Sequence, residues 1–148
     1  MWFRGKDYSN GSVTNKHDVL ADALSVYQIT RPEFNDRVYL SLTTENLKSF
    51  VYKYHDTHAV AYGSNSGDAF PDCDDFSILC FADILKGSIK EGLAQQPSFG
   101  TATVRTLKGG MHMMNFGYTA DGAFLLYEPQ TKTWLPPTSV LSIEGLHL

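Results

Sequence analysis

The sequence predicts an α+β domain in which helices come first and an antiparallel sheet follows. Apolar residues recur at helical spacing in the first half of the chain, up to about residue 86, whereas from residue 99 onward they alternate as they do in strands. Helices that precede strands, instead of alternating with them, are typical of the α+β class. With 148 residues, no internal repeat and no segment of linker composition, the chain is expected to form one domain spanning residues 1–148.

The N-terminal third is predicted to contain a helix and a short extended segment. Apolar residues within 19–27 recur at helical spacing after Thr14-Asn15, which would cap the helix, and Arg31-Pro32 would end it. Residues 38–42, rich in apolar and β-forming side chains, are expected to be extended.

A second helix is predicted to begin at Thr43 or Thr44, either of which can supply its cap. Its apolar face begins at Leu47 and has His58 as its last candidate member. Residues 59–71 are rich in Gly, Ser, Asn and Pro and are expected to form a loop that walls a cleft.

A central helix is predicted over residues 74–86, because this stretch contains neither Gly nor Pro and is apolar on nearly every side. Acidic residues in its first turn and Lys86-Gly87 at its end match the usual start and stop signals. A helix this apolar is expected at the centre of the domain. Cys73 would then lie at its N-terminus.

Cys73 is a candidate nucleophile, because a helix N-terminus offers unpaired N–H groups and the positive end of the helix dipole, which favour a thiolate. Asp72, Asp74 and Asp75 flank it and oppose this effect, because nearby negative charge raises the pKa of a thiol. A bound cation would cancel these carboxylates, and Ca2+ prefers clustered carboxylates and loop carbonyls. The alternative left open is that the aspartates cap the helix and face water.

The second cysteine, Cys80, is expected to be a small buried apolar residue. On one helix, Cys73 and Cys80 would lie about 10 Å apart along the axis, farther than the roughly 7 Å between Cα atoms that a disulfide tolerates. No two cysteines have zinc-binding spacing. Neither a disulfide nor a structural zinc site is therefore predicted.

The second half of the chain is predicted to form the sheet. A turn at Lys108-Gly109-Gly110 separates its first two strands, and Asp121-Gly122 is a hairpin signal between the second and the third. Prolines at 129, 136 and 137 are expected to end the ladder, which leaves residues 139–143 as one further edge strand. The main strands are expected over residues 99–105, 111–118 and 123–128.

The predicted hairpin carries His112 and Glu128. With a five-residue loop at 118–122, His112 lies directly opposite Glu128, at the roughly 4.5–5.5 Å between Cβ atoms that lets a carboxylate orient an imidazole. A two-residue loop at Asp121-Gly122 would instead pair Asn115 with Glu128 and turn Glu128 to the other face. The catalytic interpretation therefore requires the longer turn.

A helix-start cysteine, a strand histidine and an acid on the next strand indicate a triad of Cys73, His112 and Glu128. Each residue also has a simpler interpretation. A single histidine on a strand is more often structural or exposed, and Glu128 before a proline can be an ordinary strand-end carboxylate.

Composition and charge argue against several classes of function. A net charge of −4 and a pI near 5.6 provide no basic surface for nucleic acid. No stretch approaches the roughly 18 apolar residues of a membrane span, and the first seven residues lack the apolar core of a secretion signal. The expected protein has no nucleic-acid or membrane partner, and a cytoplasmic location is compatible with it.

Three segments carry a resemblance to a known family. Residues 72–76 read Asp-Cys-Asp-Asp-Phe, His112 lies in a strand rich in Met and Asn, and residues 127–131 read Tyr-Glu-Pro-Gln-Thr. Together they resemble the papain-like C-terminal (agglutinin C) domain of the Marasmius oreades agglutinin family, over about residues 50–136. The resemblance implies a papain-like cysteine protease fold, with N-terminal helices and a central Cys-bearing helix packed on a C-terminal antiparallel sheet.

The resemblance also implies roles for individual residues. Cys73 matches the nucleophile, His112 the general base and Glu128 the third member, while Asp74 and Asp75 fall where calcium ligands are expected. In that family the protease domain follows a sugar-binding β-trefoil, for which the first 50 residues here are too few. The chain therefore looks like the standalone bacterial or phage version, so a phage-associated location is also compatible, and glycan recognition and oligomeric state are not implied.

The expected function is that of a calcium-dependent cysteine hydrolase that acts on a peptide or protein substrate through a thioester. The backbone N–H of Cys73 would be one oxyanion donor, and Asn65 or Ser66 would supply the second. Gln130 and Asn115 are candidates for supporting roles. The alternatives are a transamidase or deamidase on the same scaffold, and a catalytically inert calcium-binding structural or interaction module.

Overall fold

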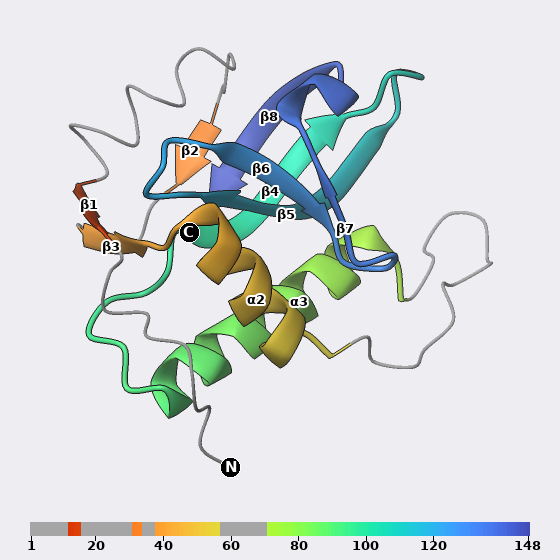
Figure 1. Cartoon of the computed structure of the whole chain (residues 1–148). Helices are drawn as coiled ribbons and strands as arrows, with labels where there is room; N and C mark the ends of the chain where they lie inside the picture. The colour runs from red at the N-terminus through yellow and green to blue at the C-terminus, as the bar shows by residue number, and fades with distance from the viewer. Residues whose placement is uncertain (1–11, 16–30, 34–37, 57–70) are drawn as a thin grey trace.

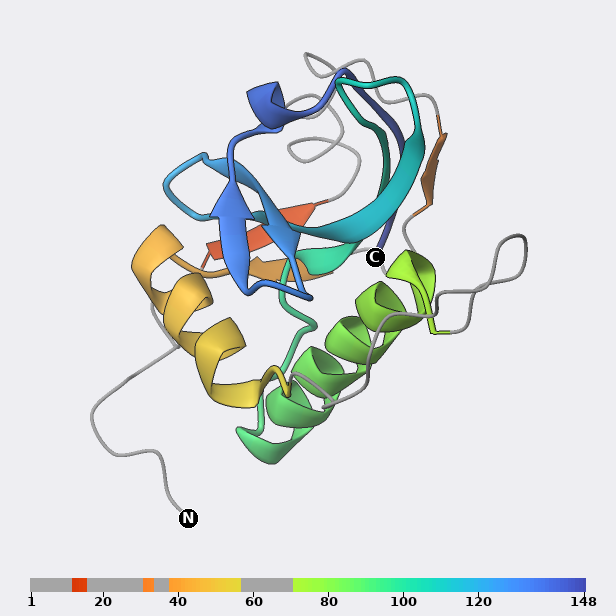
Figure 2. The ribbon, with the colours of Figure 1, turned by 90° about the vertical axis from the view of Figure 1, so that its right-hand side faces the viewer.

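The computed structural model describes residues 12–15, 31–33, 38–56 and 71–148 (Figure 1). Within them, a six-stranded sheet has the order β2-β8-β4-β5-β6-β7, and β1 and β3 form a separate two-stranded sheet. Both described helices lie on the same side of the larger sheet, below it in Figures 1 and 2. The elements are β1 (Ser12–Asn15), β2 (Arg31–Glu33), β3 (Val38–Ser41), α2 (Thr44–Tyr54), α3 (Cys73–Lys90), β4 (Phe99–Arg105), β5 (Met111–Tyr118), β6 (Phe124–Glu128), β7 (Thr133–Leu135), the 3-10 helix η3 (Pro137–Ser139) and β8 (Ser142–His147).

Two features predicted for the N-terminal third are wrong, whereas residues 38–41 are extended in β3, as expected. Thr14-Asn15, expected to cap a helix, lie in β1, which pairs antiparallel with β3. Arg31-Pro32, expected to stop that helix, belong to β2, which runs parallel to β8 at the edge of the sheet, where a proline is tolerated. The rest of that predicted helix, His58 and residues 59–70 lie outside the described residues. The described N-terminal residues thus add three strands, and the larger sheet is mixed instead of purely antiparallel.

The C-terminal strands also differ from the prediction. The ladder does not end at Pro129, because this proline falls in the turn before β7 and needs no strand hydrogen bond there. Pro137 begins η3, where a missing N–H is equally harmless. The last strand runs from Ser142 to His147 and lies between β2 and β4, so it is an internal strand rather than an edge.

Among the described residues the hydrophobic core has two parts, which lie on opposite faces of strand β5. Alternate residues of a strand point to opposite faces, so Met114 and Phe116 belong to one cluster while Asn115 reaches α3 on the other side. One cluster contains Tyr39, Ala102, Val104, Met114, Phe116, Phe124, Leu126, Ile143, Leu146 and Leu148. The other contains Leu40, Leu42, Leu47, Phe50, Val51, Cys80, Ile84, Phe99 and Tyr127.

Neither described helix is long and apolar enough to cross a membrane.

Helix α3 begins at Cys73, as predicted, but it continues past Gly87 to Lys90. Gly87 does not end the helix. A Cβ atom at this position would lie 2.4 Å from Cγ of Tyr54 on α2, so the glycine allows the two helices to approach closely. The helix is also less enclosed than expected, because Ile78 is 55% exposed within the described residues.

We expect Gly87→Ala to lower the free energy of unfolding by about 1–3 kcal/mol, because the added methyl group overlaps the Tyr54 ring. In a Tyr54→Ala background the same change should raise it by up to about 1 kcal/mol, because Ala forms helix better than Gly. Chemical denaturation of the four proteins measures both effects. The same sign in both backgrounds would contradict close helix contact as the reason for the glycine.

The N-terminus of α2 is held by two side chains. Thr43 is its cap and accepts a hydrogen bond from the Asn46 N–H at 3.2 Å, as the sequence predicted. Asp121, in the loop between β5 and β6, accepts from the Thr44 N–H at 2.9 Å and from the Thr44 hydroxyl at 2.7 Å. The Thr44 hydroxyl is the main reason that the pKa of Asp121 lies below 3.8. A carboxylate at a helix N-terminus also gains from the helix dipole.

We expect Asp121→Ala to reduce stability by about 1 kcal/mol at pH 7, because the start of α2 loses this acceptor. The pKa of Asp121 is lowered by folding, so its contribution is present above about pH 4 and is lost as the pH falls through the folded-state pKa. The difference between wild type and variant should therefore shrink between pH 7 and pH 3. Urea denaturation at both values checks this, and a difference that grows in acid would refute it.

Candidate functional site

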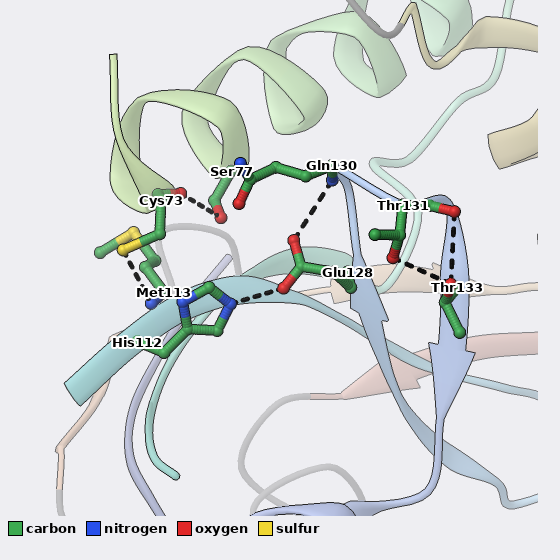
Figure 3. Close-up of polar contacts among 8 residues, drawn as sticks. All are labelled: Cys73, Ser77, His112, Met113, Glu128, Gln130, Thr131 and Thr133. Atoms are coloured by element: carbon green, nitrogen blue, oxygen red, sulfur yellow. Dashed lines mark hydrogen bonds and ion pairs between the residues drawn. The ribbon is translucent and has the colours of Figure 1, made fainter. Parts of the chain in front are cut away.

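Cys73 is the first residue of α3 and lies against β5. Its Sγ accepts a hydrogen bond from the backbone N–H of Met113 at 3.4 Å, which places it beside the residue that follows His112 (Figure 3). Asp75 helps to cap the start of α3, because its Oδ2 accepts a hydrogen bond from the Asp72 N–H at 3.0 Å. A donor aimed at the sulfur and the positive end of the helix dipole both favour the thiolate.

His112 and Glu128 are in direct contact. His112 Nε2 lies 2.5 Å from Glu128 Oε2, and the two side chains are 26% and 17% exposed. The other oxygen, Oε1, accepts from the Gln130 N–H at 3.2 Å, so both carboxylate oxygens are fixed. The carboxylate favours a proton on Nε2, which leaves Nδ1 as the basic nitrogen on the side of Cys73 in Figure 3. Among the described contacts, no hydrogen bond joins Cys73 to His112.

The β5–β6 hairpin has the longer turn that the catalytic interpretation requires. Tyr118 pairs with Phe124, so the loop is five residues, but it spans 119–123 instead of 118–122. Asn115 pairs with Tyr127, which excludes the two-residue turn that would pair it with Glu128. One residue further along the two strands, this register places Glu128 opposite Met114. Glu128 is then a diagonal neighbour of His112 on the same face, within reach of long side chains.

Asn115 supports the site in a way that the sequence did not indicate. It is fully buried, and its Nδ2 donates to the backbone oxygens of Ser77 at 3.0 Å and Gly100 at 3.1 Å. The Ser77 hydroxyl in turn donates to the Cys73 carbonyl at 2.9 Å. Asn115 therefore joins the first turns of α3 to β4 and fixes the height of Cys73 above β5. Ser77 was missed, although a serine four residues after a helix-start cysteine is a visible signal.

We expect Asn115→Ala to lower the free energy of unfolding by about 2–4 kcal/mol, because two buried carbonyls lose their donor and a cavity forms. Ser77→Ala is the matched control and should cost about 1 kcal/mol or less, since it removes a single local bond within α3. Denaturant titration compares the two. Equal losses would show that Asn115 does not tie the helix to the sheet.

The aspartates beside Cys73 form a compact acidic group. Ligand atoms of Asp72, Cys73 and Asp74 lie within 4.8 Å of one another, and Oδ1 of Asp72 is buried with no partner among the described residues. The pKa of Asp72 is raised, first by the hydrogen bond it shares with Asp74 and then by burial and the charges of Asp74 and Asp75. Two carboxylates this close need a shared proton or a cation. Asp72 and Asp74 therefore fit a hard divalent ion such as Ca2+, whereas Asp75 is engaged at the helix start.

Other predicted site residues have different outcomes. Gln130 supports Glu128 through its backbone N–H, and its side chain extends toward the first turns of α3 in Figure 3. Asn65 and Ser66, the predicted oxyanion donors, lie outside the described residues. Cys73 and Cys80 are both free thiols, and Cys80 is fully buried, as expected.

No model of a protein family and no curated protein matches the chain. Solved structures do match it. One is the Polyporus squamosus lectin bound to the human-type influenza-binding epitope Neu5Aca2-6Galb1-4GlcNAc, with a TM-score of 0.69 and 17% identity, covering 92% of this chain and 49% of the lectin. Another is a complex of PSL1a with E64, with a TM-score of 0.67 and 18% identity, covering 92% and 50%. The chain thus spans about half the length of each, and identities this low show the fold alone.

These matches correct what the sequence resemblance implied. Two of the structures found are those of the Polyporus squamosus lectin and PSL1a, and no family model supports an agglutinin C domain of the Marasmius oreades agglutinin family. The expected papain-like fold, and the descriptions as a cysteine protease and as a bacterial or phage protein, are overturned with it. The motifs were short: Asp72, Asp74 and Asp75 are of a type favoured at any helix start, and Pro129 is an ordinary turn residue.

Proposed function

We propose that Cys73, His112 and Glu128 act together as a thiol site that transfers an acyl group through a thioester on Cys73. The observation that carries this proposal is the 2.5 Å contact between His112 Nε2 and Glu128 Oε2, beside a sulfur held by the Met113 N–H. A base oriented by a carboxylate next to a helix-start thiol is the arrangement that activates a cysteine. The substrate would be the carbonyl of an amide or a peptide.

The proposed reaction has two steps. His112 Nδ1 accepts the proton of the Cys73 thiol, the thiolate attacks the carbonyl carbon to form the C–S bond, and the proton passes to the nitrogen of the leaving amine as the C–N bond breaks. Water then attacks the thioester and gives a proton to Nδ1, the C–S bond breaks to release the acid, and Nδ1 returns the proton to Cys73 Sγ. An amine in place of water would give transamidation. Glu128 orients the imidazole and stabilises its cationic form throughout.

Two further features support the mechanism. The backbone N–H of Cys73 lies at the N-terminus of α3, where helix N–H groups have no partner within the helix, so it can donate to the oxyanion. Asp72 and Asp74 would hold Ca2+, whose charge would cancel theirs beside the sulfur. We therefore expect thiolate formation to depend on calcium.

A second candidate function rests on the missing hydrogen bond between Cys73 and His112 among the described contacts. If the aspartates keep the thiol protonated, Cys73 is inert and Asp72 with Asp74 forms a structural calcium site in a binding module. The two candidates differ in one property, which is the reactivity of the sulfur.

We expect Cys73 to react with iodoacetamide at pH 6.5 with Ca2+ about tenfold faster than a model thiol, whose pKa is about 8.5 and which is only about 1% ionised there. A chelator and His112→Ala should each slow the reaction about tenfold. Glu128→Gln, which keeps the shape but removes the charge, should also slow it. Mass spectrometry with Cys73→Ala identifies the site, and buried Cys80 serves as an internal unreactive thiol. Alkylation no faster than the model thiol under every condition would support the inert module instead.

Two compounds named with the matching structures can serve as probes of ligand binding by this chain. E64 is named with PSL1a, and the sialylated trisaccharide with the Polyporus squamosus lectin. Thermal-shift titration of this chain with each compound, in wild type and in Cys73→Ala, separates binding at the thiol from binding elsewhere. E64 binding that requires Cys73 would support the thiol site.

A further inference from the structure

A cavity of about 670 Å3 lies between α2 and the β6–β7 hairpin, which run beside each other in Figure 2. This volume is in the range of small-molecule sites. None of the triad residues or aspartates described above lines it. Its lining residues are Lys48, Ser49, Tyr52, Lys53, Tyr127, Lys132 and Trp134.

The floor of the cavity is a rigid aromatic surface. The rings of Tyr127 and Trp134 have centroids 4.6 Å apart, and Phe99 packs edge-on against Trp134 at 6.3 Å. Tyr127 is buried, and its hydroxyl bonds to His55 Nδ1 at 2.8 Å, so this ring cannot turn away. Tyr52, which is 79% exposed, forms an outer wall. A flat apolar platform already in place suits a ligand with a flat apolar face.

The rim of the cavity is positively charged. It carries three of the twelve Lys and Arg residues of a chain whose net charge is −4, and its described lining residues include no carboxylate. Lys53 is paired with Glu91 at 3.0 Å. Lys132 lies over the Tyr52 ring, 5.8 Å from its centroid, and Lys48 is exposed beside it on α2. The ammonium groups of Lys132, which lies over the Tyr52 ring, and of Lys48 on the rim favour an anionic ligand.

Lys132 has a strained backbone conformation. Its φ of 53° makes it the one non-glycine residue in the left-handed region among those described. Glycine or asparagine would adopt this conformation with less strain. Turn geometry therefore does not explain a lysine here, whereas a role for its ammonium group at the cavity does.

We propose that this cavity binds a small carboxylate with a flat apolar body, the body stacked on Trp134 and the carboxylate held by Lys132 and Lys48. An aromatic acid and a pyranose sugar acid share this chemistry. The site is independent of the proposed thiol chemistry, because the two share no residue.

The test is calorimetric titration with two acids, indole-3-acetate and glucuronate, and with their uncharged counterparts, indole-3-acetamide and methyl glucoside. We expect one acid to bind at least about tenfold more tightly than its uncharged counterpart, with affinity falling as salt is added. Lys132→Gly should weaken binding at least about tenfold while the melting temperature stays equal or rises, because glycine relieves the strained φ. Lys108→Gln, an exposed lysine in the β4–β5 turn, is the matched control and should bind normally.

Lys132→Gln separates charge from backbone effects, since it keeps the strained position but removes the ammonium group. It should lose affinity as Lys132→Gly does. The identity of the acid that binds distinguishes an aromatic from a sugar ligand. Equal binding of acid and uncharged counterpart, unchanged affinity in both Lys132 variants, or no binding of either acid would overturn the proposal.

Discussion

The contact between the first turn of α3 and strand β5 is the constraint on which the candidate site depends. The Asn115 amide donates to the Ser77 carbonyl of the helix and to the Gly100 carbonyl of the neighbouring strand β4, so it ties α3 to the sheet. The Met113 N–H then reaches Cys73 Sγ. A helix terminus that moved by one turn would rise about 5.4 Å and lose the Asn115–Ser77 and Met113–Cys73 bonds. The position of the sulfur is therefore set by a buried amide and not by the helix alone.

Opposing charges decide what the sulfur at that position can do. The helix terminus and the Met113 N–H favour a thiolate, whereas Asp72 and Asp74 disfavour it. The helix dipole is equivalent to about half a charge, and a single full carboxylate charge nearby outweighs it. The close approach of Asp72 and Asp74 is itself unfavourable without a shared proton or a cation. One ion at this point would remove both problems, which links occupancy of the acidic group to the state of the thiol.

The sequence correctly predicted those elements whose start and end depend on residues next to them in the chain. Strands β4 and β5 have the predicted bounds, Thr43 caps α2, and Cys73 begins α3. Predictions failed where a distant partner decides the outcome. Gly87 reads as a helix stop but is required by the Tyr54 ring, which lies on another helix. Thr14-Asn15 reads as a cap, yet pairing with β3 makes it a strand.

In the candidate site, too, features set by neighbouring residues were predicted, whereas features set by distant partners were not. His112 and Glu128 were predicted as partners from hairpin parity, and the loop length was right although its position was shifted by one residue. Asn115 was predicted as a supporting residue, but no sequence pattern reveals that its amide meets a helix carbonyl 38 residues away. The short motifs around Cys73 and Glu128 suggested a family that the structural matches do not support. Residues that cap helices and form turns recur in unrelated folds, so such motifs carry less information than their chemistry suggests.

The turn between β6 and β7 connects the two parts of the molecule for which we propose a role. Its first residues fix Glu128, through the Gln130 N–H, and its last residues place Lys132 above Tyr52. Within the turn, the hydroxyl groups of Thr131 and Thr133 are hydrogen-bonded to each other, with their oxygens 2.9 Å apart. A turn held by its own hydrogen bonds keeps a fixed shape whether or not a ligand lies on either side. That rigidity allows a strained lysine and an oriented carboxylate to occur within five residues of chain, and it means that a change at one need not disturb the other.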